Sequence, residues 1–212
     1  MKHTPKLLSI FLLFLLLTAC SPHTTPQKTA PSPQSEIGET AREPSGRELF
    51  VEALLSQSGS AGEILGTDQR YAAWFAQRQN YRVEPWEDES VAWCVCFLYW
   101  GIGQCEDYVN FDFDDPGVRT ADVDLLYAFF SDTGRRTDDP KPGDIVFFDT
   151  DPEDEDPTVN HAGAVAKIDA STIYIIEGNT LRGQNHPTGT AAVLSYDLSD
   201  PRILGYGKLD WK

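Results

Sequence analysis

The hydrophobic pattern of the chain changes once, and this change decides its fold class. In several segments between residues 45 and 134, large apolar residues recur every three or four positions, which is typical of amphipathic helices. After Pro142 they gather in short runs rich in β-branched and aromatic residues, separated by turn residues, which is typical of strands. Helices followed by strands predict an α+β domain whose helices pack on an antiparallel sheet.

Local signals place the individual elements. A first helix is expected to start at Ser45, because Ser45 and Glu48 have the spacing of a capping box. The other three helices are expected around residues 71–79, 90–101 and 120–133. The strands are expected at residues 145–148, 164–168, 173–176, 193–196 and 203–206.

The N-terminus has the features of an export signal. Lys2 and Lys6 precede an apolar run at 7–17, which is too short to cross a bilayer as a helix. The run ends in Leu-Thr-Ala-Cys, which resembles the lipobox of bacterial lipoproteins. We therefore expect a signal peptide at 1–19 and a lipidated Cys20, which would hold an exported protein on the membrane facing the cell wall or periplasm. An ordinary signal peptide with an incidental cysteine is the alternative.

Composition divides the rest of the chain. Residues 20–45 are expected to be a disordered tether, because Ser, Thr, Pro and Gln predominate there and large apolar residues are almost absent. Residues 46–212 are expected to form a single domain, and we expect it to be a monomer. The net charge of −16 argues against binding to nucleic acid.

Cys94 has the features of a catalytic nucleophile. A helix N-terminus and a neighbouring imidazolium both lower the pKa of a thiol, and Cys94 lies in the first turn of the expected third helix. Within the globular region the base is either His161 or His186. We favour His161, because Ala162 and Gly163 after it leave room for a substrate backbone, whereas His186 lies in a turn-like run. A structural, hydrogen-bonded histidine is the alternative for His161.

A third polar group must orient the imidazole. Glu177 ends an apolar run and Asn179 follows two residues later, so both side chains are expected on the same face of a strand. Glu177 is the expected orienting residue. Asn179 either assists it or donates to the oxyanion, and the sequence leaves both roles open.

Four segments, in order, resemble the successive motifs of CHAP domains, the cysteine, histidine-dependent amidohydrolases/peptidases. They are residues 93–97, 142–148, 160–165 and 176–179. The resemblance implies a papain-like α+β fold that cleaves peptidoglycan amides without a cofactor. The bond lies either between muramic acid and L-alanine or within the peptide. By the same resemblance, the catalytic residues are Cys94, His161, Glu177 and Asn179, and Trp93 and Gly163 are expected near the substrate.

Two features depart from this pattern. Cys96 and Cys105 are additional cysteines, and they either form a disulfide or remain as buried thiols. Acidic residues crowd the segment 149–156, where a solvated hairpin is expected, with a Ca²⁺ site as the alternative, so no metal is assigned.

Two other functions remain open. The first is a non-catalytic lipoprotein that binds the wall and retains the fold. The second is a cysteine peptidase of the NlpC type, although that family typically has a second histidine where this chain has Glu177 and Asn179.

Overall fold

The computed structural model describes residues 42–58, 70–78, 93–119, 121–151, 158–180 and 189–212. Residues from Arg42 to Lys212 belong to one compact unit. In this unit the helices come before the sheet along the chain, and every strand pairing is antiparallel. The predicted α+β class is therefore confirmed. The predicted signal peptide, lipidated Cys20 and most of the tether lie outside the described residues.

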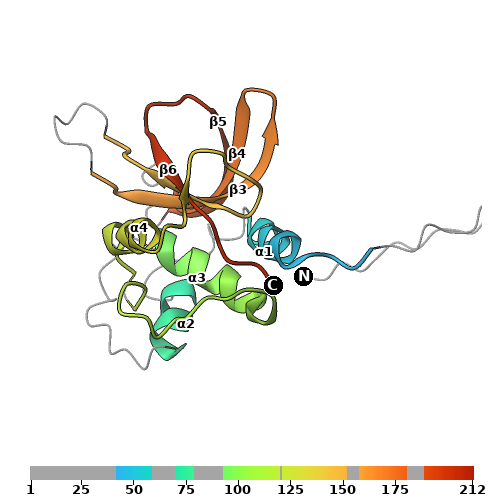
Figure 1. Cartoon of the computed structure of the whole chain (residues 1–212), viewed down its shortest axis with the longest axis vertical. Helices are drawn as coiled ribbons and strands as arrows, with labels where there is room; N and C mark the ends of the chain where they lie inside the picture. The colour runs from blue at the N-terminus through green and yellow to red at the C-terminus, as the bar shows by residue number, and fades with distance from the viewer. Residues whose placement is uncertain (1–41, 59–69, 79–92, 120, 152–157, 181–188) are drawn as a thin grey trace, which may run out of the picture. The chain divides into compact units, whose positions relative to one another are not determined.

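The sheet has six strands in the order β1-β6-β2-β3-β4-β5. They are β1 (Arg136–Thr137), β2 (Ile145–Phe148), β3 (His161–Asp169), β4 (Thr172–Thr180), β5 (Thr190–Asp197) and β6 (Ile203–Gly207). Figure 1 labels β3, β4, β5 and β6. The five predicted strands are all present. The two-residue strand β1 was not predicted, because two residues are too few to give an alternating pattern.

Four α-helices and one short 3-10 helix are described. They are α1 (Gly46–Leu55), α2 (Arg70–Arg78), α3 (Cys94–Gln104), η2 (Glu106–Tyr108) and α4 (Val123–Asp132). The predicted capping box is confirmed, since the Ser45 side chain accepts from the Glu48 backbone and the Glu48 side chain accepts from the Ser45 backbone. Asp122 caps α4 with its side chain, which accepts from the backbone N–H groups of Asp124 and Leu125.

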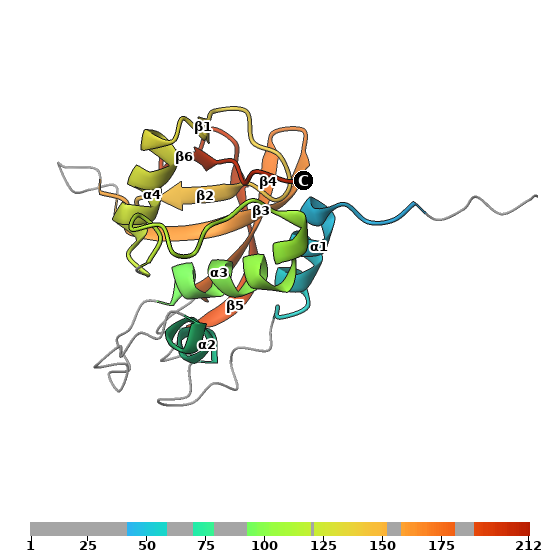
Figure 2. The ribbon, with the colours of Figure 1, turned by 60° about the horizontal axis from the view of Figure 1, so that its bottom comes forward.

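Helix α3 is the centre of the helical layer. It contacts α1 and α2 on one side and strands β3 and β4 on the other, so it lies between the sheet and α2 (Figure 2). Eight of its eleven residues are buried, which agrees with a helix that is apolar on all sides. This position fixes its first residue, Cys94, against the sheet.

Our prediction that α3 ends by Gly101 is wrong. A Cβ atom at Gly101 would lie 2.6 Å from Leu54 Cδ2, and one at Gly103 would lie 2.4 Å from Trp74 Cζ2. The two glycines therefore let α1 and α2 approach α3 closely, and the helix continues through both of them.

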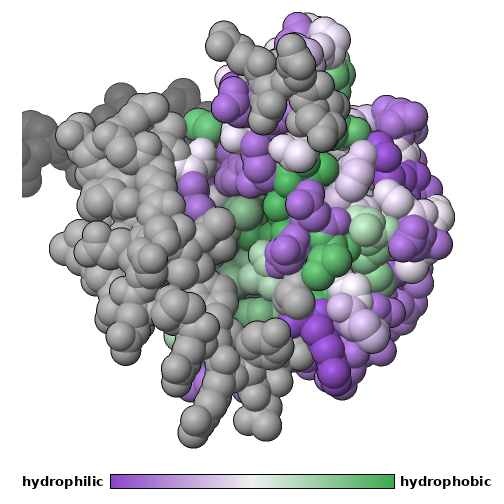
Figure 3. Space-filling view, turned by 90° about the vertical axis from the view of Figure 1, so that its left-hand side faces the viewer, coloured by the Kyte–Doolittle hydropathy of each residue, from purple (hydrophilic) through white to green (hydrophobic). Residues whose placement is uncertain are grey.

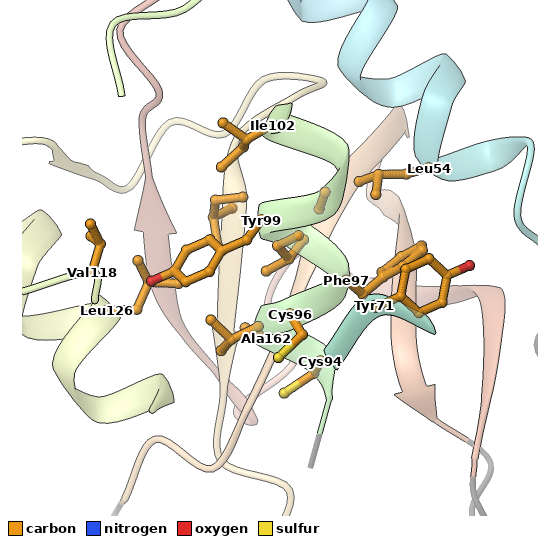
Figure 4. Packing of buried hydrophobic residues seen from close by; sticks show 14 of the residues in the cluster. Leu54, Tyr71, Cys94, Cys96, Phe97, Tyr99, Ile102, Val118, Leu126 and Ala162 are labelled. Carbon is orange, nitrogen blue, oxygen red and sulfur yellow. The ribbon is translucent and has the colours of Figure 1, made fainter. Parts of the chain in front are cut away.

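Apolar residues cover both faces of the sheet. The larger core lies between the helices and the sheet and includes Phe97, Tyr99 and Ala162 (Figure 4). A smaller core on the other face consists of six buried residues, namely Val146, Phe148, Val165, Ile173, Ile175 and Tyr206. Side chains on β3 and β4 thus alternate between two buried environments, which explains why these strands read as continuous apolar runs.

No described helix has the length and apolar character needed to span a bilayer. On the face where α4 lies and β3 begins, hydrophobic residues gather near the centre, with some hydrophilic residues among them and more toward the right-hand edge (Figure 3).

Candidate active site

Cys94 is the first residue of α3, and its thiol meets the first strand residues of β3. It hydrogen bonds with the His161 side chain and accepts from the backbone N–H groups of Ala162 and Val95. In Figure 4 its sulfur lies at the N-terminal end of α3, beside Ala162. The Cys94 residue is 2% exposed, so the thiol is almost covered.

The pKa of Cys94 is lowered below its ordinary value of 9.0. Burial alone would raise the pKa, because it disfavours the charged thiolate. The hydrogen bond and the charge of His161 outweigh burial, and the two backbone donors add to their effect. The surroundings therefore favour a thiolate at Cys94.

His161, the first residue of β3, lies between the thiol and a carboxylate. Its Nε2 is 2.9 Å from Glu177 Oε2, which leaves Nδ1 for the Cys94 sulfur. Burial lowers the pKa of the imidazole, but the hydrogen bonds to Cys94 and Glu177 and their negative charges raise it to about 10. A thiolate and an imidazolium thus stabilise each other.

Glu177 on β4 provides the carboxylate. It is 1% exposed, and its second oxygen, Oε1, accepts a hydrogen bond of 2.6 Å from the Tyr196 hydroxyl on β5. Gly178 brings the strand close to α3, because a Cβ atom there would lie 2.7 Å from Phe97 Cβ and from Trp93 Cζ3. The structure therefore brings Cys94, His161 and Glu177 together in the predicted order.

Asn179 is placed less simply than the strand pattern predicts. Strand β4 does not end at Glu177 but continues to Thr180, and its register with β5 shifts between these two residues. Asn179 adopts a left-handed φ of 57°, so regular alternation with Glu177 is lost. Its buried Oδ1 has no hydrogen-bond partner among the described residues.

A cavity of about 570 Å³ adjoins the imidazole. His161, Glu177 and Asn179 line it together with Tyr196 and Arg202. Cys94 is not among the lining residues, so this space lies on the carboxylate side of the imidazole.

The two predicted substrate-contacting residues both lie near the site but are enclosed. The ring of Trp93 stacks on Tyr71 at a centroid distance of 5.3 Å, and the residue is 1% exposed. A Cβ atom at Gly163 would lie 2.6 Å from Ile175 Cγ2 and 2.9 Å from Glu177 Cγ. The space beside Gly163 is thus filled by the protein's own side chains, and the ring of Trp93 has almost no free surface.

Cys94, Cys96 and Cys105 are all free and buried. A disulfide between Cys96 and Cys105 is incompatible with the structure, because α3 runs from Cys94 to Gln104 and separates them by nine residues. At about 1.5 Å per residue their Cα atoms are roughly 13 Å apart, and a disulfide needs less than about 7 Å. Burial raises the pKa of both thiols, that of Cys105 to about 11, so neither resembles Cys94.

Two other sequence candidates fall mainly outside the described residues. His186 lies in the segment 181–188, and most of the acidic segment lies at 152–157. In the described part of the chain no group of three or more His, Cys, Asp or Glu side chains could hold a metal ion.

Sequence reasoning missed Tyr196. The strand that carries it was predicted, but its contact with Glu177 depends on how β4 and β5 pair. Its ring also packs on Phe148, at a centroid distance of 5.2 Å. An aromatic residue in a predicted strand beside the strand of Glu177 is the one signal that the sequence offers.

A thiol at a helix N-terminus, an imidazole and a carboxylate in one line are the arrangement that cysteine hydrolases use. The family model described as CHAP domain matches residues 86–179. This range contains Cys94, His161, Glu177 and Asn179, and the chain therefore carries a CHAP domain. Such domains are in general cysteine- and histidine-dependent amidohydrolases or peptidases. No curated protein and no solved structure matches the chain significantly.

Proposed function

We propose that this chain is a peptidoglycan hydrolase that cleaves an amide bond of the bacterial cell wall, with Cys94 as nucleophile and His161 as base. The observation that supports this most is the hydrogen-bonded line from Cys94 through His161 to Glu177 within a CHAP domain. The bond is that of either an N-acetylmuramoyl-L-alanine amidase or a peptidoglycan endopeptidase.

In the proposed cycle the Cys94 thiolate attacks the carbonyl carbon of the scissile amide. The backbone N–H of Cys94, the first residue of α3, has no acceptor within the helix and is available to donate to the oxyanion. Protonated His161 then gives its proton to the leaving amine, which departs and leaves a thioester on Cys94. Neutral His161 takes a proton from water, the resulting hydroxide releases the acid, and the thiolate and imidazolium are restored.

Glu177 keeps the imidazole in position through both steps. Its contact with Nε2 directs Nδ1 to the sulfur and stabilises the imidazolium. Asn179, whose buried oxygen is unpaired among the described residues, is proposed to orient the imidazole or to donate to the oxyanion through its amide nitrogen.

We further propose that the protein is exported and held at the membrane by lipid on Cys20. The support is the signal-like run followed by Leu-Thr-Ala-Cys. Labelling of cells with a radioactive fatty acid would detect the lipid on the wild type and not on Cys20→Ser. Label that persists in this variant would contradict the anchor.

The decisive experiment on the proposed activity compares Cys94→Ala with Cys96→Ala on purified peptidoglycan. Both thiols are buried in α3 two residues apart, so Cys96→Ala controls for the loss of a core thiol. We expect no cleavage by Cys94→Ala and retained cleavage by Cys96→Ala. Mass spectrometry of the fragments identifies the bond, because a new amino group on L-alanine means an amidase and one inside the stem or bridge means an endopeptidase.

One observation favours a second candidate, a wall-binding lipoprotein without turnover. The Cys94 residue is 2% exposed, and a substrate reaches its sulfur only if covering groups move aside. Alkylation by iodoacetamide separates the two functions. An accessible low-pKa thiol reacts well below pH 8, whereas a sealed core thiol does not react in the folded protein.

A further inference from the structure

Tyr196 completes the hydrogen bonding of the buried Glu177 carboxylate. Its hydroxyl donates to Oε1 at 2.6 Å, while Oε2 lies 2.9 Å from His161 Nε2. Each carboxylate oxygen therefore has one side-chain partner, and the three residues come from the adjacent strands β3, β4 and β5.

The ring of Tyr196 is itself held on two sides. Phe148 packs against it at a centroid distance of 5.2 Å, and the Arg202 guanidinium lies 5.1 Å from its centre. Phe148 also packs against the His161 ring, at 5.9 Å. The hydroxyl is thus held in a fixed place relative to both the carboxylate and the imidazole.

The hydroxyl remains a donor throughout the working pH range. Burial raises the pKa of Tyr196 well above its ordinary value of 10.0, and the negative charge and hydrogen bond of Glu177 raise it further. A neutral phenol beside a carboxylate has only one way to satisfy both groups, which is to donate its proton to that oxygen.

Without this donor Glu177 would have an unsatisfied buried oxygen. Burial of an unpaired charged oxygen is costly, so the carboxylate would turn toward another donor or toward water. Turning about its last bond moves both oxygens at once, and the contact with His161 Nε2 would be lost or lengthened. The imidazolium would lose its partner, and the Cys94 thiolate would lose part of its stabilisation.

We infer that Tyr196 is a positioning residue, which locks the Glu177 carboxylate and thereby the His161 imidazole in the geometry that activates Cys94. The inference rests on the proposed function. The CHAP match ends at residue 179, so it does not assign Tyr196, which lies on the next strand.

The test compares Tyr196→Phe with Tyr206→Phe. Both tyrosines pack in the smaller core, but the buried Tyr206 hydroxyl has no hydrogen-bond partner in the described part of the chain. Each change removes one hydroxyl and keeps the ring. Two properties are measured for each variant, namely the kinetics of peptidoglycan cleavage and the rate of Cys94 alkylation by iodoacetamide as a function of pH. Each variant is also combined with Glu177→Gln, and the measurements are repeated. Alkylation is measured in the Cys96→Ala, Cys105→Ala background, so that Cys94 is the one thiol of the folded domain that reports.

We expect Tyr196→Phe to lower kcat by about tenfold or more, which is the effect of losing a hydrogen bond to a charged group, with KM changed less than about twofold. The pH midpoint of Cys94 alkylation is expected to rise, because the thiolate is less stabilised. The charged or titratable groups that interact with Cys94, His161 or Tyr196, and that therefore bear on this midpoint, are Cys94, His161, Glu177, Asp200 and Arg202. Tyr206→Phe is expected to change neither measurement.

The coupling between Tyr196→Phe and Glu177→Gln provides a sharper criterion. In the Glu177→Gln background, Tyr196→Phe should shift the alkylation midpoint no further, because the hydroxyl acts through the carboxylate. An unchanged midpoint and kcat in Tyr196→Phe, equal effects of Tyr206→Phe, or full additivity with Glu177→Gln would each overturn the inference. A wild type whose Cys94 is alkylated well below pH 8 but that fails to cleave peptidoglycan overturns the proposed function alone and leaves this criterion in force. A Cys94 that is not alkylated in the folded wild type overturns the inference.

Discussion

Gly163 offers a direct test of how the site is packed. It pairs with Glu177 across β3 and β4, so a side chain added at Gly163 would project on the face of the sheet that carries the carboxylate. We predict that Gly163→Ala lowers both the stability of the domain and the reactivity of Cys94, because the new methyl group displaces Glu177.

The size of the effect follows from three distances. The added Cβ atom would lie 2.6 Å from Ile175 Cγ2, 2.9 Å from Glu177 Cγ and 3.0 Å from the Ile176 carbonyl oxygen. None of these atoms is the free end of a flexible side chain, and the carbonyl oxygen belongs to the strand backbone. Overpacking of this kind costs about 1 to 3 kcal/mol, which lowers Tm by about 3 to 10 °C in a domain of this size.

The assay combines thermal unfolding with the pH dependence of Cys94 alkylation. A midpoint that rises by one pH unit makes alkylation about tenfold slower on the acid side. Gly134→Ala is the matched control, because Gly134 has a φ of +65° and nothing within 4 Å of the added Cβ atom. The control should lose about 1 kcal/mol of stability from its backbone conformation and leave alkylation unchanged.

Two results would refute this reasoning. If Gly163→Ala has the wild-type Tm and the wild-type alkylation profile, the close packing is wrong. If alkylation is unchanged but peptidoglycan cleavage is lost, Gly163 serves the substrate, as the sequence predicted, and not the placement of Glu177.

Three further predictions concern other parts of the domain. Arg47→Met should lower the free energy of unfolding by about 2 to 3 kcal/mol in chemical denaturation, because it removes the ion-pair partner, at 2.8 Å, of Asp144, which is 1% exposed. Lys167→Met is the control, since it breaks an exposed ion pair and should cost less than about 0.5 kcal/mol. Equal losses in the two variants would contradict the prediction. Asn179→Gly should raise the free energy of unfolding by about 1 kcal/mol, because it removes a buried unpaired oxygen and replaces a side-chain-bearing residue at a left-handed φ. The same variant should cleave peptidoglycan more slowly. Full cleavage would show that Asn179 has no part in the reaction. The pH profile of kcat/KM should rise as the nucleophilic thiol ionises below its ordinary pKa and fall near pH 10, where the His161 imidazolium loses its proton; an alkaline limb near pH 6.5 would contradict the ion pair.

The strands were predicted well because both faces of the sheet are buried. Strand β2 is buried over its whole length and β4 over most of it, so both are rich in apolar residues, and the turns between the strands carry the usual turn residues. The limits of α3 were predicted less well. Gly101 is a common signal for the end of a helix, but here it is selected by the close approach of Leu54, a contact that local sequence does not reveal.

The strand argument for Asn179 has a related limit, although Glu177 and Asn179 do line the same cavity. A spacing of two residues predicts one common face only in a regular strand, and the register shift between Glu177 and Thr180 removes that regularity. The contact between Tyr196 and Glu177 could not be predicted for the same reason, because it runs diagonally from β5 to β4 and depends on the register of these strands. The order of Cys94, His161 and Glu177, in contrast, required only that α3 begin near β3 and that β3 pair with β4.

The activated thiol depends on the completed fold. Cys94 and His161 are far apart in the sequence, and the imidazole reaches the sulfur only when the first residues of β3 pack against the start of α3. An unfolded chain therefore carries an ordinary thiol, protonated at neutral pH and weakly nucleophilic. Newly synthesised, unfolded copies of this protein would therefore be unreactive, and the reactive thiol would form together with the native state.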